Sequence, residues 1–199
     1  TSHKPLPEEA FPRPLEKRGS EKLSLTFDKG EPTGLNGQRF ARPVEAIRAL
    51  DAVTGPWAIG RDVHVGDTIL GTKGRVGFEA GAAWAVIQAH QLLEKHVLTK
   101  WQMYWKKQLA DWYGMLLHEA QYLDPVMRDI EAFLAHSQER VSGQVFLTLY
   151  PYRFTLDGIE SDNDLMKPGF SDYGEMNKAW SAEDVKGFTK IMSNNLKLL

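Results

Sequence analysis

The chain has 199 residues, and its 24 Lys and Arg and 26 Asp and Glu side chains give a formal net charge of −2 with neutral histidines. This balance argues against the clustered basic surface on which non-specific binding to nucleic acids and membranes depends. The absence of cysteine excludes disulfide scaffolds, thiol nucleophiles and thiolate-bound zinc. No apolar stretch approaches the length of a membrane span. The sequence predicts a cytoplasmic protein that binds neither nucleic acid nor membrane.

The N-terminal part is expected to combine an extended arm, short strands and one helix. Pro, Glu, Lys and Arg dominate residues 1–21, which predicts an arm lying over other elements. Alternating apolar residues over 23–27 predict a strand, and a second short strand is expected before the turn-forming pair Asn36-Gly37. A helix is expected over residues 43–54, because Pro43 suits its first turn and apolar residues recur on one face.

The middle of the chain is expected to hold a hairpin and three helices. Residues 60–78 are rich in Gly and Val and predict two paired strands, with a tight turn at Gly66-Asp67. A first helix is expected over residues 80–97. A second is expected to begin at Lys100, after a capping box at Thr99, and a third after Asp124-Pro125. The second of these helices carries aromatic residues on more than one side, which predicts burial either in the core or between subunits.

The C-terminal part is expected to contain two antiparallel strands, over 145–149 and 154–156, and a last helix capped near Ser181. The predicted fold class is therefore α+β, with a mixed or antiparallel sheet packed against long helices and a C-terminal oligomerisation helix. The predicted domains are residues 1–170 and an oligomerisation arm and helix over 171–199.

The sequence contains no recognisable metal or nucleotide motif. None of the six histidines lies four residues from another, and His118-Glu119 lacks the second histidine of H-E-x-x-H because position 122 is Tyr. Neither G-x-x-x-x-G-K-[ST] nor G-x-G-x-x-G is present. Gly71, Gly74 and Gly77 either bring backbone N–H groups to an anion or mark turns and bulges. The residues alone predict no metal site and no catalytic residue.

Two longer segments are more specific. Residues 59–67 read Ile-Gly-Arg-Asp-Val-His-Val-Gly-Asp, and residues 71–79 read Gly-Thr-Lys-Gly-Arg-Val-Gly-Phe-Glu. Together with Leu98–Trp101, Ser137–Val141 and Gly158–Ser161, they closely resemble the C-terminal half of argininosuccinate synthase. The segments occur in the order and spacing of that family, and the resemblance covers nearly all of the chain.

The resemblance implies the synthetase and multimerisation half of a carbon–nitrogen ligase. Members of that family join citrulline to aspartate, with ATP and Mg, and release argininosuccinate, AMP and pyrophosphate in arginine biosynthesis. It implies that ATP is bound mainly by an N-terminal domain outside this chain, and that this half alone is inactive. It further implies a homotetramer, with this half supplying one wall of the citrulline pocket.

The resemblance also implies candidate citrulline-binding residues. Ser2 falls near a family serine that contacts citrulline, while Gly66 and Phe78 stand where many members carry a glutamate and a tyrosine. The glutamate pairs with the substrate's α-ammonium. Asp67 is expected to replace it if Gly66-Asp67 forms a turn, and His64 shares the face of Gly66 in a strand. Alternatively, His64 is a solvated strand residue and Asp67 only a turn former.

The loss of polar groups at positions 66 and 78 has two further implications. An ammonium buried without its carboxylate is costly, which predicts that the parent enzyme prefers a citrulline with an acylated, uncharged α-nitrogen. The competing interpretation is a stand-alone interaction module that has kept the oligomerising helices and lost catalysis. Glu79 is expected to be a charge at the start of the next helix.

Overall fold

The computed structural model describes residues 3–166, 179–194 and 196. The chain divides into two compact units, Thr1–Asn163 and Asp164–Leu199. The domain boundary predicted at residue 170 lies outside the described residues. No helix in the described part of the chain is long and apolar enough to cross a membrane.

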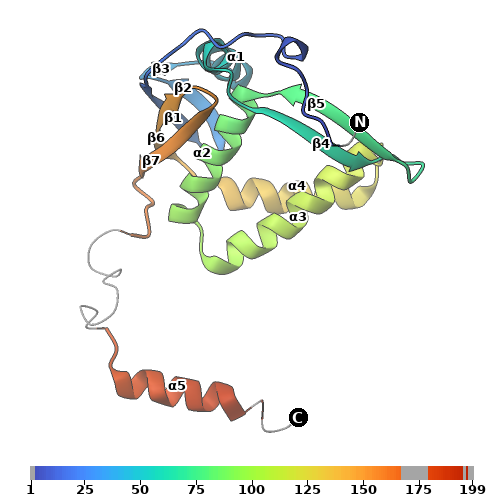
Figure 1. Cartoon of the computed structure of the whole chain (residues 1–199). Helices are drawn as coiled ribbons and strands as arrows, with labels where there is room; N and C mark the ends of the chain where they lie inside the picture. Colours follow the sequence, from blue (N-terminus) through green and yellow to red (C-terminus); the bar gives the residue numbers. More distant parts are fainter. Residues whose placement is uncertain (1–2, 167–178, 195, 197–199) are drawn as a thin grey trace. The chain divides into compact units, whose positions relative to one another are not determined.

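The first unit combines two antiparallel sheets with four helices, so the predicted α+β class is confirmed (Figure 1). Its strands are β1 (Glu21–Asp28), β2 (Glu31–Leu35), β3 (Gln38–Arg39), β4 (Arg61–Asp67), β5 (Lys73–Glu79), β6 (Gly143–Tyr150) and β7 (Arg153–Glu160). Its helices are α1 (Pro43–Thr54), α2 (Gly81–Val97), α3 (Lys100–His118) and α4 (Pro125–Gln138), with short 3-10 turns η1 (Glu8–Ala10) and η2 (Gly55–Trp57). The second unit contains α5 (Ala182–Asn194).

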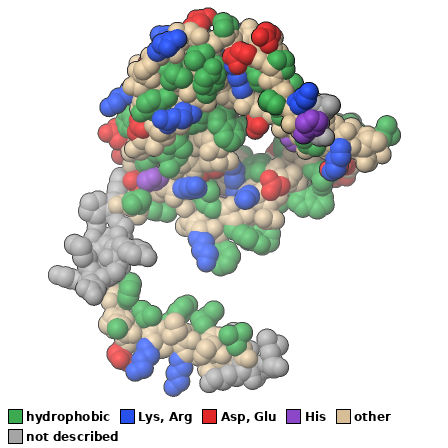
Figure 2. All heavy atoms as spheres, in the orientation of Figure 1, with side chains coloured by type: hydrophobic (Ala, Val, Ile, Leu, Met, Phe, Trp, Pro, Cys, Tyr) green, Lys and Arg blue, Asp and Glu red, His purple; other side chains and the backbone are tan. Residues whose placement is uncertain are grey.

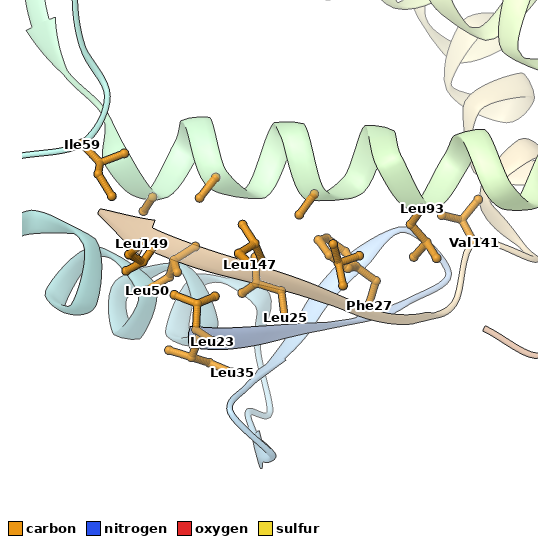
Figure 3. Close-up of a cluster of buried hydrophobic side chains, with 14 of the residues drawn as sticks. Leu23, Leu25, Phe27, Leu35, Leu50, Ile59, Leu93, Val141, Leu147 and Leu149 are labelled. Carbon is orange, nitrogen blue, oxygen red and sulfur yellow. The ribbon is translucent and has the colours of Figure 1, made fainter. Parts of the chain in front are cut away.

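The main sheet has the strand order β3-β2-β1-β6-β7. In its central pair, Leu25 lies opposite Val145 and Leu23 opposite Leu147, so apolar residues of both strands share one face. That face is buried, and Figure 3 shows Leu25 and Leu147 on the side of the sheet that α2 covers. Each leucine removed from water here stabilises the fold by about 1.5–3 kcal/mol.

Helix α2 approaches the sheet closely because three small residues, Ala82, Ala85 and Ala89, lie on its buried side. Leu93 continues the same side one turn later, and Leu50 of α1 completes the contact. The spacing of these residues by three and four matches the helical repeat. Helix α2 therefore crosses the sheet. It begins beside the β4–β5 hairpin, which extends away from the sheet (Figure 1).

Side-chain caps fix the helix starts that the sequence predicted. Thr99 accepts a hydrogen bond from the N–H of Gln102, whose side chain accepts one from the N–H of Thr99, a complete capping box. Asp124 accepts from the N–H of Val126 at 2.9 Å. Ser181 and Asp184 form the corresponding reciprocal pair before α5. Each cap satisfies backbone donors that have no partner within the helix.

A buried polar cluster joins three helices. The carboxylate of Glu94 on α2 has a side chain only 1% exposed and pairs with Lys106 of α3 at 3.0 Å. It also accepts a hydrogen bond from the amide of Gln138 on α4, at 2.8 Å. Because the Gln138 nitrogen is thereby used, its oxygen accepts from Nε2 of His90, also at 2.8 Å. Burial lowers the pKa of His90, although the Glu94 carboxylate acts in the opposite direction.

The predicted turn at Gly66-Asp67 is wrong. Strand β4 continues through Asp67, which pairs with Lys73, and Gly66 pairs with Gly74. The two strands are joined by a five-residue loop, Thr68 to Thr72. The N–H of Thr68 donates a hydrogen bond to the carbonyl of Thr72 and closes this loop. Gly71 has φ +81° and supplies the left-handed residue that this reversal needs.

The expectation that α3 is central to the core of one chain is also wrong. Leu116 is its only buried residue, while Trp101, Trp105 and Trp112 are 63%, 55% and 57% exposed. One side of α3 packs on α4 through Leu116, Met127 and the partly buried Tyr113, while Tyr104 and the three tryptophans lie on the surface. The other alternative, that the aromatic residues of α3 are buried between subunits, stays a prediction.

Candidate functional site

A pocket of about 500 Å³ lies where the base of the β4–β5 hairpin meets the first turns of α2 and the β6–β7 turn. Its walls include Asp62 of β4, Phe78 of β5, Trp84 and Ile87 of α2, Tyr152 of the β6–β7 turn and Arg153 at the start of β7. This size and a mainly apolar lining with a few polar groups are typical of sites for small molecules.

The pairing of the hairpin places Phe78 in this pocket. Phe78 lies directly opposite Asp62, so both side chains are on the same face of the hairpin. Trp84 and Ile87, three residues apart on α2, present their side chains to the same space. Phe78, Trp84 and Ile87 are 40%, 51% and 48% exposed. The result is an accessible apolar wall rather than part of the closed core.

The remaining predicted residues lie along the hairpin, away from this pocket. His64 and Gly66 share the face of Asp62, as expected for alternate residues of a strand. The His64 ring lies over Gly66: a Cβ added at Gly66 would come 2.5 Å from His64 Nε2. His64 thus fills the space that a side chain at position 66 would need.

Asp67 lies on the opposite face of β4 from Gly66, as the continuous strand requires. Its carboxylate forms an ion pair with Lys73 across the hairpin. Asp67 therefore does not stand in for a carboxylate at position 66. Ser2, the fifth predicted residue, lies outside the described residues.

The expectation that Glu79 is a helix-start charge is wrong, because Glu79 is the last residue of β5 and its side chain is 1% exposed. Its two oxygens accept from Nε of Arg13 at 2.8 Å and from Nε of Arg61 at 2.9 Å. Arg61 also donates to Glu8, and Arg13 donates twice to the side-chain carboxylate of Asp51 on α1. Burial lowers the pKa of Arg61, but the hydrogen bonds that it donates to Glu8 and Glu79 and the charges of these carboxylates outweigh burial and raise that pKa overall.

The N-terminal arm is tied to the second face of the hairpin by these contacts. The Arg61 guanidinium lies 4.5 Å from the ring centroid of Phe11. Further along, Leu6 lies against Gly77, and Arg75 donates to the carbonyl of Lys4. The arm runs along the hairpin (Figure 1), and its contacts with Arg61, Arg75 and Gly77 are on the face that carries Asp67 rather than on the face of Phe78.

Electrostatically, the pocket carries two charges without an ion-pair partner among the described residues. Within the described part of the chain, the Asp62 carboxylate accepts one hydrogen bond, from the backbone N–H of Val63 at 2.7 Å. The Arg153 guanidinium stacks 4.3 Å from the ring centroid of Tyr150. The third charge, on Arg61, is already neutralised by Glu8 and Glu79. The pocket therefore offers one negative and one positive group beside an apolar wall.

Asp62, Trp84 and Arg153 line the pocket but were not among the residues predicted from the sequence. Asp62 had an available signal, since it is an even number of residues from His64 and Gly66 and so shares their face of a strand. Trp84 and Arg153 had none, because only the folded chain brings α2 and the β6–β7 turn to the hairpin. Among the residues described, no group of three or more His, Asp or Glu side chains could hold a metal ion.

Comparison with known proteins identifies the family. Residues 9–199 match the family model described as the arginosuccinate synthase C-terminal domain. The chain is 35% identical over 177 residues to the argininosuccinate synthase of Dictyoglomus thermophilum, covering 89% of this chain and 44% of that protein. It is 37% identical to that of Xanthomonas campestris (87% and 44%) and 33% identical to that of Methanocaldococcus jannaschii (72% and 37%).

The chain thus spans less than half of the length of these relatives. The segments on which the resemblance rests, at the hairpin and at the start of α3, all lie within the matched residues. With 96% of the chain (191 of 199 residues) inside the family model, the assignment does not depend on a short motif. The chain belongs to the arginosuccinate synthase C-terminal domain family.

Proposed function

We propose that this chain is the synthetase and multimerisation half of a ligase that joins citrulline to aspartate in arginine biosynthesis, with ATP converted to AMP and pyrophosphate. The observation that carries the proposal is the match of residues 9–199 to the family's C-terminal domain, at less than half of the relatives' length. The Phe78 pocket, open on the hairpin face that the arm leaves free, forms one wall of the citrulline site.

The residues that the structure describes do not fit ATP. They include no phosphate-binding glycine loop, and no group of acidic or histidine side chains that would hold Mg. We assign the nucleotide site to the part of the longer protein outside this chain. This chain binds and orients citrulline, and alone it is inactive.

The exposed apolar surfaces of α3 and α5 belong to the same proposal. On α5, Phe188 and Ile191 are 64% and 69% exposed, and Figure 2 shows hydrophobic side chains along one side of this helix with Lys residues on the other. Contiguous apolar surfaces of this kind mark protein interfaces. We assign them to contacts within a homotetramer.

The test compares the longer gene product with this chain alone. Citrulline-, aspartate- and ATP-dependent release of pyrophosphate, with argininosuccinate identified by mass spectrometry, is expected from the longer protein and not from the chain. A longer protein that releases no pyrophosphate with citrulline would refute the ligase proposal.

A second candidate is a stand-alone interaction module that has lost catalysis, favoured by the exposed aromatic residues of α3. It predicts no upstream coding region for a nucleotide domain with a Ser-Gly-Gly-x-Asp loop. Sequencing upstream of this segment separates the two candidates. Finding such a loop in frame would exclude the module.

A further inference from the structure

We propose that the Phe78 pocket is a zwitterion site in which Asp62 pairs with a free α-ammonium group and Arg153 with the neighbouring carboxylate. The inference rests on the proposed function only for the identity of the amino acid, citrulline. It replaces the expectation that the α-nitrogen must be acylated.

The pocket contains two opposite charges that are not paired with other described residues. Asp62 and Arg153 line the same pocket, yet neither has an ion-pair partner among the described residues, and they do not bridge to one another. Opposite charges that converge on one pocket but stay apart leave room for a ligand with both charges between them. A free α-amino acid has this pattern, with an ammonium and a carboxylate on one carbon.

The other carboxylates of the hairpin are not available to pair with an ammonium group in this pocket. Asp67 faces the arm side and is paired with Lys73. Glu79 is buried and shared between Arg13 and Arg61. Position 66 has no side chain, and the His64 ring fills its space. Asp62 alone among these positions combines the Phe78 face with an unpaired carboxylate.

The surroundings of each charge also favour this arrangement. Phe78 lies opposite Asp62 across the hairpin, and Trp84 lines the same pocket, so an ammonium at Asp62 would lie among aromatic side chains, which attract cations. Helix α2 begins in this wall with no side-chain cap and no acidic residue in its first turn. The partial positive charge of that helix end therefore adds to the positive charge that Arg153 brings to the pocket.

The arrangement also confers specificity. An N-acyl group would remove the positive charge that Asp62 attracts and would leave this carboxylate facing a neutral amide. A hydrogen-bonded charge pair of this kind changes affinity by about tenfold or more. The pocket therefore selects a free amino acid over its N-acyl derivative.

The test measures dissociation constants by calorimetry and NMR titration on the protein as described. The probes are L-citrulline, N-acetyl-L-citrulline and 5-ureidopentanoate, which lacks the α-amino group. The unmodified protein is expected to bind L-citrulline about tenfold more tightly than either analogue. Asp62→Asn is expected to abolish this preference and to leave the affinity for the two analogues within about twofold. Arg153→Gln is expected to weaken all three, because each has a carboxylate.

Asp129→Asn, on the exposed surface of α4, is the matched control and should change none of the three constants. An Asp62→Asn variant that keeps the preference for L-citrulline refutes the inference and leaves the ligase proposal intact. Asp62-dependent binding of other free amino acids, but not of citrulline, supports the inference and removes the proposed substrate. Failure of every free amino acid to bind the folded protein refutes the zwitterion site.

Discussion

Glu79 is the residue on which the base of the hairpin depends. Its carboxylate is 1% exposed and is shared by Arg13 and Arg61, whose side chains are 33% and 8% exposed. A carboxylate in this position offsets two positive charges, one of them buried. The arrangement connects the arm, α1 and the strand that carries Phe78.

Replacing Glu79 by Gln is expected to lower the free energy of unfolding by about 3 kcal/mol, because it leaves the buried Arg61 without half of its counter-charge. Urea denaturation measures the change. Glu45→Gln, which removes an exposed pair with Arg42, is the control and should cost less than about 1 kcal/mol. Equal effects of the two substitutions would show that burial at Glu79 carries no weight.

Gly60 at the foot of β4 is required for a different reason. Its φ is +78°, and a Cβ at this position would approach the carbonyl carbon of Ala80 to 2.6 Å. Gly37 has nearly the same φ, +81°, with nothing within 4 Å of its Cβ position. A side chain at Gly37 would therefore meet only backbone strain, whereas a side chain at Gly60 would meet the same strain and a steric clash.

Gly37→Ala is expected to cost about 1 kcal/mol, from left-handed backbone strain alone. Gly60→Ala is expected to cost about 2–4 kcal/mol, because the neighbouring backbone must also move. Thermal and urea unfolding of both variants test the difference. Similar costs would mean that the hairpin base accommodates the methyl group without strain.

Among the elements, the three helices joined by Glu94 respond to pH through His90. The groups that face His90 are Glu94 on its own helix, Lys106 of α3, Gln138 of α4 and the ring of Phe27 in β1. Burial holds the pKa of His90 below its ordinary value of 6.5, so the folded state binds a proton less readily than the unfolded state. Stability contributed by neutral His90 is therefore complete above about pH 6.5 and falls as the pH drops below it.

Replacing His90 by Gln is expected to flatten this dependence between pH 7 and pH 5. Carboxylates that titrate in the same range contribute to both proteins, so the informative quantity is the difference between the two unfolding free energies at each pH. His136→Gln, which changes a side chain that is 81% exposed, is the control. Its unfolding free energy should depend on pH in the same way as that of the unmodified protein. A difference that is constant from pH 7 to 5 would contradict the assignment.

Helices and strands with local signals could be predicted from the sequence, and those that depend on distant contacts could not. The bounds of α1 and the caps of α3, α4 and α5 follow from residues within one turn. The turn at Gly66-Asp67 was misplaced because a Gly-first pair suits a tight turn, whereas Thr68 and Thr72 close a wider one. At the site, Phe78 was found through the resemblance, but Trp84 and Arg153 needed the fold.

At the scale of the whole molecule, the exposed aromatic residues of α3 suggest association. Three tryptophans there are more than half exposed, and Trp101, Tyr104 and Trp105 form edge-to-face ring contacts with centroids 6.0 and 5.6 Å apart. Such a surface is costly to leave in water. The proposed homotetramer would cover it.

Light scattering over a dilution series is expected to give a mass above that of one chain. Replacing Trp105 and Trp112 by Glu is expected to lower the mass at every concentration while the chain stays folded by circular dichroism, because neither side chain is buried within the chain. Leu70→Glu at the hairpin tip, a side chain 90% exposed, is the control and should keep the mass. A monomer at all concentrations would refute a role for α3 in association.

The central pair of the main sheet joins residues from far apart in the chain. Leu25 of β1 lies opposite Val145 of β6, a separation of 145 − 25 = 120 residues. During synthesis the partner of β1 therefore leaves the ribosome only after the hairpin and helices α1 to α4. Closing so long a loop slows folding, and the leucines of β1 remain uncovered by their neighbouring strand for most of translation of this half. The β1–β6 pair at the centre of the finished sheet therefore cannot form until β6 has been made, whereas β1, β2 and β3 are available to pair from the start.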